Sequence, residues 1–280
     1  MDLYNSLRLK TGRHLPRRFH CYCLGAAKTA TTSISSMFQH RYDSRHEPDI
    51  ANTNAAIIQY LENLTSESAM AAYLRERDQQ LKLELESTHS LVYVAQNLVE
   101  LFPAARYIVT IREPMEWLRS RMNFHFKKHP PVWEQYRQYF WMDRVTDYAP
   151  EEALLREHEL ASLDVYLAQY NDHYERIESA LPKDKTLILR TNEISNACDR
   201  IADFLNIKAA TIFSEHANTQ PEKALFVDQL DTEFVVQKVW QHCSELIRNY
   251  FPERLGFYTE KLSSLRPPEM PPTPPRSNQR

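Results

Sequence analysis

The sequence has few of the features that mark several large classes of protein. No apolar run approaches the roughly 20 residues that cross a bilayer, and the first 18 residues lack the apolar core of a signal peptide. The formal net charge is −3, so no overall positive field favours nucleic acid or an anionic membrane. We therefore expect a cytoplasmic protein that binds neither of them. An anionic ligand would have to be held by a local cluster of cations.

Cysteine is also scarce. The four cysteines include no CxxC pair, which argues against a zinc site. Cys21 and Cys23 stand two apart in an apolar run, so on a strand they would share one face and would be too constrained to form a disulfide. We expect them, with Cys198 and Cys243, to be reduced thiols in the core, and we predict no metal site.

The composition indicates one folded domain with unstructured ends. Hydrophobic residues make up 42% of the 280 residues, enough to build a substantial core. Six prolines lie between Leu265 and Arg280, and they exclude a helix or a central strand there. We predict an N-terminal extension at 1–16, one domain at 17–262 and a disordered Pro-rich tail at 263–280.

The body of the chain alternates between strand and helix patterns. Strand patterns occur at Phe19–Leu24, Lys82–Glu86, Tyr107–Ile111 and Thr186–Leu189, of which the last two indicate buried strands, with a further possible strand near Tyr42–Ser44. Helical spacing follows after Thr32, before Pro103, after Pro114, over much of Trp133–Leu181, around Ile201 and from Val235 to Tyr250. This alternation predicts an α/β, three-layer fold with a central parallel sheet flanked by helices. Ligands of such folds bind at the carboxyl ends of the strands.

The first candidate site follows the first strand. Gly25, Ala26, Ala27, Lys28, Thr29, Ala30, Thr31, Thr32 and Ser33 form a turn that opens into a helix. Backbone N–H groups at a helix start bind anions, the hydroxyl groups can add donors, and Lys28 adds a point charge. The nearest rival motif is the G-x-x-x-x-G-K-[ST] loop of nucleoside triphosphate enzymes, but here Ala27 stands before the lysine. A capped helix with a surface lysine is the plainer alternative.

The second candidate site follows the strand Tyr107–Ile111. Arg112 comes directly after this strand, and Ser120 lies eight residues further along, about two turns into the next helix. An arginine at a strand's carboxyl end is placed to bind a dianionic phosphate with its guanidinium. An ordinary arginine salt bridge would explain the arginine equally well. His125, Lys127, Lys128 and His129 form a basic stretch that we expect to be a solvated face.

Together the two sites resemble the sulfotransferase family that uses 3′-phosphoadenosine 5′-phosphosulfate (PAPS). GAAKTATTSI is similar to its P-loop-like strand–loop–helix site for the 5′-phosphosulfate, and YIVTIREPMEWLRS is similar to its 3′-phosphate segment. The resemblance runs from about Arg17 to Ile207 and implies that residues 25–33, Arg112 and Ser120 bind PAPS and its product PAP. Two departures stand out. Ala30 replaces a usual glycine, and His216–Lys223 replaces a Gly-rich nucleotide segment.

The resemblance also implies the chemistry. An acceptor oxygen or nitrogen would displace PAP at sulfur without a metal, and Lys28 would neutralise the leaving phosphate oxygen. Glu47, in the string Arg45-His46-Glu47-Pro48, is the favoured catalytic base because this string looks like a family segment that carries a catalytic glutamate. His89 is the second candidate, since it follows the short strand before the phosphate strand.

Two other functions stay open at this point. One is a P-loop kinase that uses ATP and magnesium, which the missing Gly-Lys pair and the position of Arg112 disfavour. The other is a catalytically silent nucleotide-binding protein, which the presence of Lys28, Arg112 and Ser120 disfavours. We expect the acceptor to be a small molecule, because family members that modify glycans and proteins carry a membrane anchor that is not seen here.

Overall fold

The computed structural model describes residues 16–126, 131–214 and 226–263, and within these ranges five short strands pair into one parallel sheet. The order across the sheet is β2-β3-β1-β4-β5, and every pair of neighbours is parallel. The strands span Cys21–Cys23 (β1), Ser44–His46 (β2), Leu85–Ser87 (β3), Arg106–Ile111 (β4) and Thr186–Arg190 (β5). The predicted fold, an α/β three-layer arrangement around a parallel sheet, is confirmed.

Side chains alternate between the two faces of the sheet and build a separate core on each. Cys21 and Cys23 lie in one apolar cluster with residues of α2 and α10, whereas Tyr22 and Leu24 lie in the other. The two cysteines therefore share one face as predicted, and both are free thiols. Cys243 is also buried, but Cys198 is only partly buried, because it begins helix α10 at the rim of its cluster.

Strand β5 differs from the prediction in its burial. Its pattern of Thr, Leu, Ile and Leu suggested a fully buried strand, yet among these residues only Leu189 is buried. The reason is the strand order, since β5 is at the edge of the sheet and pairs only with β4 among the described strands. In contrast, β4 lies between two neighbours and is buried from Tyr107 to Ile111.

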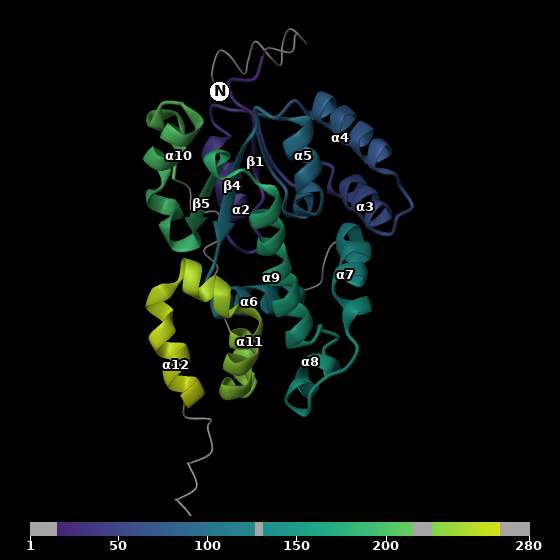
Figure 1. Cartoon of the computed structure of the whole chain (residues 1–280), viewed down its shortest axis with the longest axis vertical. Helices are drawn as coiled ribbons and strands as arrows, with labels where there is room; N and C mark the ends of the chain where they lie inside the picture. Colours follow the sequence, from purple (N-terminus) through teal and green to yellow (C-terminus); the bar gives the residue numbers. More distant parts are fainter. Residues whose placement is uncertain (1–15, 127–130, 215–225, 264–280) are drawn as a thin grey trace, which may run out of the picture.

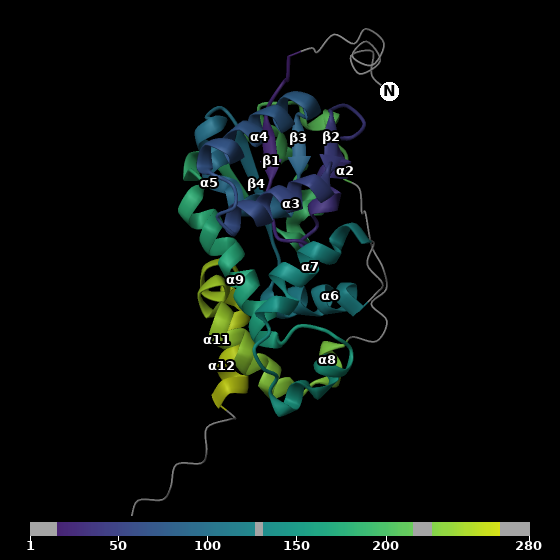
Figure 2. The same cartoon turned by 90° about the vertical axis from the view of Figure 1, so that its right-hand side faces the viewer.

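Helices cover both faces of the sheet and continue beyond the carboxyl ends of its strands. Figure 2 shows α6, α7, α8, α11 and α12 gathered below the sheet, and the long α9 joins the two parts (Figure 1). Their bounds are Thr31–Phe38 (α2), Ile50–Leu61 (α3), Glu67–Leu81 (α4), Ala95–Leu101 (α5), Pro114–Phe126 (α6), Glu134–Phe140 (α7), Ala153–Glu157 (α8), Leu163–Ala180 (α9), Cys198–Leu205 (α10), Thr232–Tyr250 (α11) and Leu255–Ser263 (α12). Helix α9 packs against α5, α6 and α11, so it ties the helical part to the sheet.

Some predictions concern residues outside the described ranges. These are most of the extension at 1–16 and of the tail at 263–280, the residues Lys127, Lys128 and His129, and the segment 216–223. Among the described helices, none combines the length and the apolar character that a membrane span requires.

Candidate functional site

The predicted site residues follow four neighbouring strands at one edge of the sheet. Glu47 comes directly after β2, and His89 lies two residues after β3. The loop that starts at Gly25 follows β1 after Leu24, and Arg112 comes directly after β4. Because the strand order is β2-β3-β1-β4, the two base candidates lie on one side of the β1 loop and Arg112 lies on the other.

The loop between β1 and α2 is compact and passes close to β4. A Cβ on Gly25 would come within 1.9 Å of Thr110 Oγ1, so only glycine fits at this position. The N–H of Thr29 donates to the carbonyl of Ala26 at 3.2 Å and closes a tight turn. The turn holds Lys28 at φ 74° and Ala30 at φ 73°, both in the left-handed region that non-glycine residues rarely adopt. Ala30 therefore adopts the backbone conformation that its position predicts for glycine, at a conformational cost.

Thr29 shapes the loop and does not face its open side. Its side chain is fully buried, and its hydroxyl lies 2.6 Å from the carbonyl oxygen of Ala26 and 2.7 Å from the hydroxyl of Thr110. The hydroxyl of Thr191, just after β5, donates to the carbonyl of Thr29. The expectation that the Thr29 hydroxyl would donate to a ligand is therefore corrected, because its proton is used inside the loop.

The start of α2 has the geometry that suits an anion, and the side chain of His46 lies against its first turn. The first N–H groups of any α-helix lack a carbonyl partner in the helix, and those of α2 belong to Thr31, Thr32 and Ser33. The hydroxyl groups of Thr31 and Thr32 each lie 3.2 Å from Nε2 of His46. His46 thus joins the helix start to Glu47, whose Oε2 lies 3.7 Å from Nδ1 of the same ring.

Helix α6 lies against the loop and holds its middle. Trp117 donates its indole N–H to the carbonyl of Ala27 at 2.9 Å. Nζ of Lys28 lies 4.9 Å from the ring centroid of Phe124, one turn beyond Ser120 on the same helix. These two contacts bring the lysine of the first predicted site next to the helix that carries the serine of the second.

Arg112, Glu116 and Ser120 lie at successive turns of the α6 region, on one stripe. Nε of Arg112 is 3.5 Å from a carboxylate oxygen of Glu116, and Ser120 is half-buried. Tyr170 of α9 holds the backbone of Arg112, because its hydroxyl exchanges hydrogen bonds with both the N–H and the carbonyl. The position of this arginine at the carboxyl end of β4 is therefore fixed by two elements, β4 and α9.

The two candidates for the catalytic base are hydrogen-bonded to each other. Nδ1 of His89 lies 2.9 Å from Oε1 of Glu47, and the histidine side chain is 7% exposed. Nε2 of His89 is buried and makes no hydrogen bond with any described residue. The ring is stacked on Trp133 at 5.5 Å and meets Tyr136 edge-on at 5.4 Å. A buried polar nitrogen without a partner is costly, so this nitrogen is suited to form a hydrogen bond with a bound molecule.

The charge of Glu47 is stabilised despite its burial. Burial alone would raise the pKa of its carboxyl group, but the hydrogen bond and the charge of His89, together with His46 and Arg121, outweigh it and lower the pKa. Glu47 is therefore ionised at neutral pH. An ionised carboxylate at Nδ1 favours the tautomer of His89 that leaves Nε2 unprotonated.

Two residues near the site had no role in the sequence-based prediction, and each lies beside a residue that did. Arg77 of α4 is buried, forms two 2.6 Å bonds to Glu86 of β3 and donates to the carbonyl of Pro48, next to Glu47. The His46-Glu47 pair was visible as a string, but nothing in it showed that the histidine reaches α2.

The prediction for His125 was wrong. It was expected on a solvated face, but it is buried, and its Nδ1 lies 2.8 Å from the hydroxyl of Tyr166. No group of three or more metal-ligating side chains occurs in the part of the chain that the structure describes.

Comparisons with known proteins identify a family and a fold. A family model described as a sulfotransferase domain matches residues 21–223. Among solved structures, sulfotransferase STF9 from Mycobacterium avium is 11% identical with a TM-score of 0.50, over 89% of this chain and 81% of the other. A sulfotransferase from Alicyclobacillus acidocaldarius is 14% identical with a TM-score of 0.47, over 84% of this chain and 96% of the other. The first of these supports the fold alone. A comparison with curated proteins finds no match.

Proposed function

The chain belongs to the sulfotransferase domain family, whose model matches residues 21–223, and on this premise we propose that it transfers a sulfuryl group from PAPS. The acceptor is a hydroxyl or amine of a small molecule, and PAP is released. The observation that carries the proposal is the placement of the Lys28 loop after β1 and of Arg112 after β4, on neighbouring strands.

The donor would lie along this edge of the sheet. The N–H groups at the start of α2, with the hydroxyls of Thr31 and Thr32, suit the 5′-phosphosulfate. Arg112 and Ser120 suit the 3′-phosphate, because a guanidinium pairs well with a phosphate dianion. Ser33 and the backbone from Gly25 to Ala30 complete the proposed donor site, in which Thr29 acts only through the shape of the loop.

The Glu47–His89 pair is proposed to handle the proton of the acceptor. The open atom of the pair is Nε2 of His89, whereas both oxygens of Glu47 face imidazole rings. We therefore assign His89 as the base and Glu47 as the residue that orients it and stabilises its positive charge. This reverses the order of preference drawn from the sequence, where the two residues were rivals.

In the proposed step the acceptor oxygen or nitrogen attacks sulfur while the bond from sulfur to the phosphate oxygen of PAP breaks. The electron pair of that bond stays on PAP, where Lys28 neutralises the growing charge. The proton of the acceptor passes to Nε2 of His89, and the carboxylate of Glu47 balances the resulting imidazolium. The step needs no metal.

The kinase and the silent binding protein remain the alternatives to exclude by experiment. The test is incubation of the protein with PAPS labelled with sulfur-35 and a panel of alcohols, phenols and amines, with PAP release and labelled product as the two readouts. We expect both PAP and labelled product, formed at a rate that EDTA does not change and that Lys28→Ala strongly reduces. ATP turnover that requires magnesium would support the kinase. PAP binding without any transfer would support the silent protein.

A further inference from the structure

Arg121 is a buried cation that the proposed reaction does not use. It lies on α6 directly after Ser120, and its exposed fraction is 5%. Trp141 and Phe124 surround its guanidinium, with their ring centroids at 4.8 and 5.7 Å from Cζ. Aromatic faces attract a cation, but they do not accept its N–H bonds in the way that a carboxylate does.

No carboxylate pairs with Arg121 in the described part of the chain. Nε of Arg121 is buried without a hydrogen-bond partner, and no ion pair or hydrogen bond joins the guanidinium to a described residue. Arg77 shows the usual arrangement, since this arginine is 6% exposed and both of its terminal nitrogens bond to Glu86 at 2.6 Å. Burying a guanidinium without an anion costs free energy of folding. Arg121 is therefore suited to pair with an anion that the described residues do not supply.

The surroundings of Arg121 place it in the region of the proposed site. Burial lowers the pKa of Arg121, and the negative charge of Glu47 is among the effects that oppose this. The ring of Phe124, 5.7 Å from Cζ of Arg121, also lies 4.9 Å from Nζ of Lys28, so Arg121 and the lysine of the donor loop meet the same side chain.

On the basis of the proposed function, we propose that Arg121 binds a carboxylate of the acceptor, so that the acceptor is a hydroxy acid. Its hydroxyl would lie at Nε2 of His89, and its carboxylate would complete the ion pair that Arg121 lacks. A carboxylate brings one negative charge, which one guanidinium neutralises. A phosphate monoester would bring nearly two charges, one more than a single guanidinium neutralises.

The test compares matched acceptors that differ only at the carboxyl group. Examples are 4-hydroxybenzoate against its methyl ester and 3-hydroxybutyrate against its methyl ester, with kcat/KM for sulfur-35 transfer from PAPS as the readout. We expect wild-type protein to prefer an acid over its ester on the order of 10²-fold, as for a buried charge-assisted pair. Arg121→Gln should remove this preference while transfer to the ester stays within about 3-fold. Arg121→Lys should keep part of the preference for the acid, because lysine keeps the positive charge but loses the paired N–H donors of the guanidinium.

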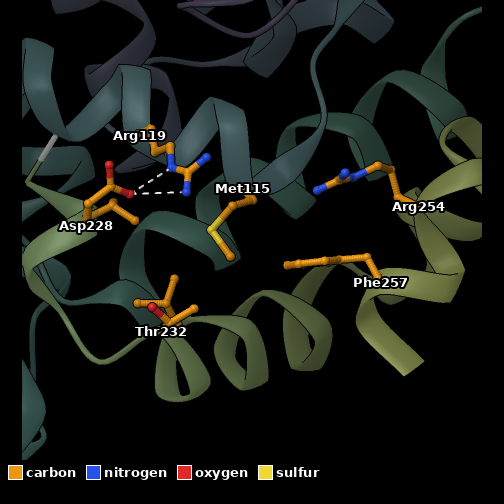
Figure 3. A pocket seen from close by; sticks show the side chains of 8 residues that line it. Met115, Arg119, Asp228, Thr232, Arg254 and Phe257 are labelled. Atoms are coloured by element: carbon orange, nitrogen blue, oxygen red, sulfur yellow. Dashed lines mark hydrogen bonds and ion pairs between the residues drawn. The ribbon is translucent and has the colours of Figure 1, made fainter. Parts of the chain in front are cut away.

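Arg119 offers a matched control on the same helix. Its guanidinium pairs with Asp228 at 3.1 Å in a separate pocket between α6, α11 and α12 (Figure 3). Arg119→Gln removes the same charge two residues away, and we expect it to leave the preference for the acid intact.

The results separate this inference from the proposed function. Equal transfer to acids and esters by wild-type protein would refute the proposed role of Arg121 and leave the proposed sulfotransfer intact. This comparison uses wild-type protein alone, so it does not depend on whether a variant folds. An equal loss for acid and ester in Arg121→Gln, with unchanged melting temperature, also overturns it. If the protein prefers a phosphate monoester to both the acid and the ester, Arg121 binds a phosphate, and the proposal that it binds a carboxylate is wrong. No transfer to any acceptor, acidic or neutral, would instead count against the proposed function and would overturn the inference that rests on it.

Discussion

The hydrogen bond between Glu47 and His89 gives a prediction that can be worked from its length. If His89 is the base, its ring becomes an imidazolium 2.9 Å from the carboxylate oxygen in the transition state. Two unit charges at this distance attract by roughly 6 kcal/mol at an effective dielectric constant of about 20, and by roughly 1.4 kcal/mol at about 80. Glu47 is 19% exposed, so its environment lies between these limits. We expect Glu47→Gln to cost roughly 2–3 kcal/mol, which is about 30- to 150-fold in kcat.

Removal of the base itself should cost more. We expect His89→Asn to reduce kcat by roughly 10²–10⁴-fold, the usual contribution of a general base. The double variant should be no slower than His89→Asn, because Glu47 acts only through the histidine. PAP affinity should stay unchanged in all three. His242→Asn breaks a similar pair with Asp164, of length 2.8 Å, on α11 and α9, and should leave kcat unaltered.

The assay is single-turnover sulfur-35 transfer, which separates chemistry from product release. A loss in Glu47→Gln that exceeds the loss in His89→Asn would refute the assignment and make Glu47 the base. Losses that multiply in the double variant would show that the two residues act independently, which is incompatible with the proposed relay.

Three further substitutions test other parts of the site. Lys28→Ala should lower kcat by roughly 10²–10³-fold and PAP affinity much less, because its charge acts on the leaving oxygen; equal effects on both constants would make Lys28 a binding residue only. Ala30→Gly should stabilise the fold by up to about 1 kcal/mol in urea unfolding, since glycine adopts φ 73° without strain, and a loss of stability would contradict the loop geometry. Arg77→Met should destabilise by about 3–5 kcal/mol, because Glu86 is left buried and unpaired, and adding Glu86→Leu should restore most of this; no recovery would rule out the unpaired charge as the cause.

The sequence predicted the sheet and the placement of the donor-side candidates at the ends of its strands because these depend on local patterns. The run from Tyr107 to Ile111 is apolar and β-branched, and Arg112 ends it, so the strand and the position of the arginine were visible together. Likewise the turn from Gly25 to Ser33 joins an apolar strand to a helix start. Such features need only neighbours in the chain.

The acceptor side could not be predicted in this way because it depends on which strands are neighbours. Glu47 and His89 lie 42 residues apart in the sequence, and only the pairing of β2 with β3 brings them together. Helices α3 and α4, which connect these strands and supply Arg77, were not predicted. Arg121 gave no signal either, since a lone arginine in an amphipathic helix is usually exposed.

The central claim is that the donor carries a 3′-phosphate bound by Arg112, and calorimetric titration of PAP and adenosine 5′-phosphosulfate tests it most directly. Adenosine 5′-phosphosulfate lacks the 3′-phosphate and otherwise keeps the donor groups. We predict that Arg112→Ala weakens PAP binding by about 2–4 kcal/mol and leaves adenosine 5′-phosphosulfate nearly unaffected. An equal loss for both ligands, or no measurable PAP binding to wild-type protein, would contradict the account.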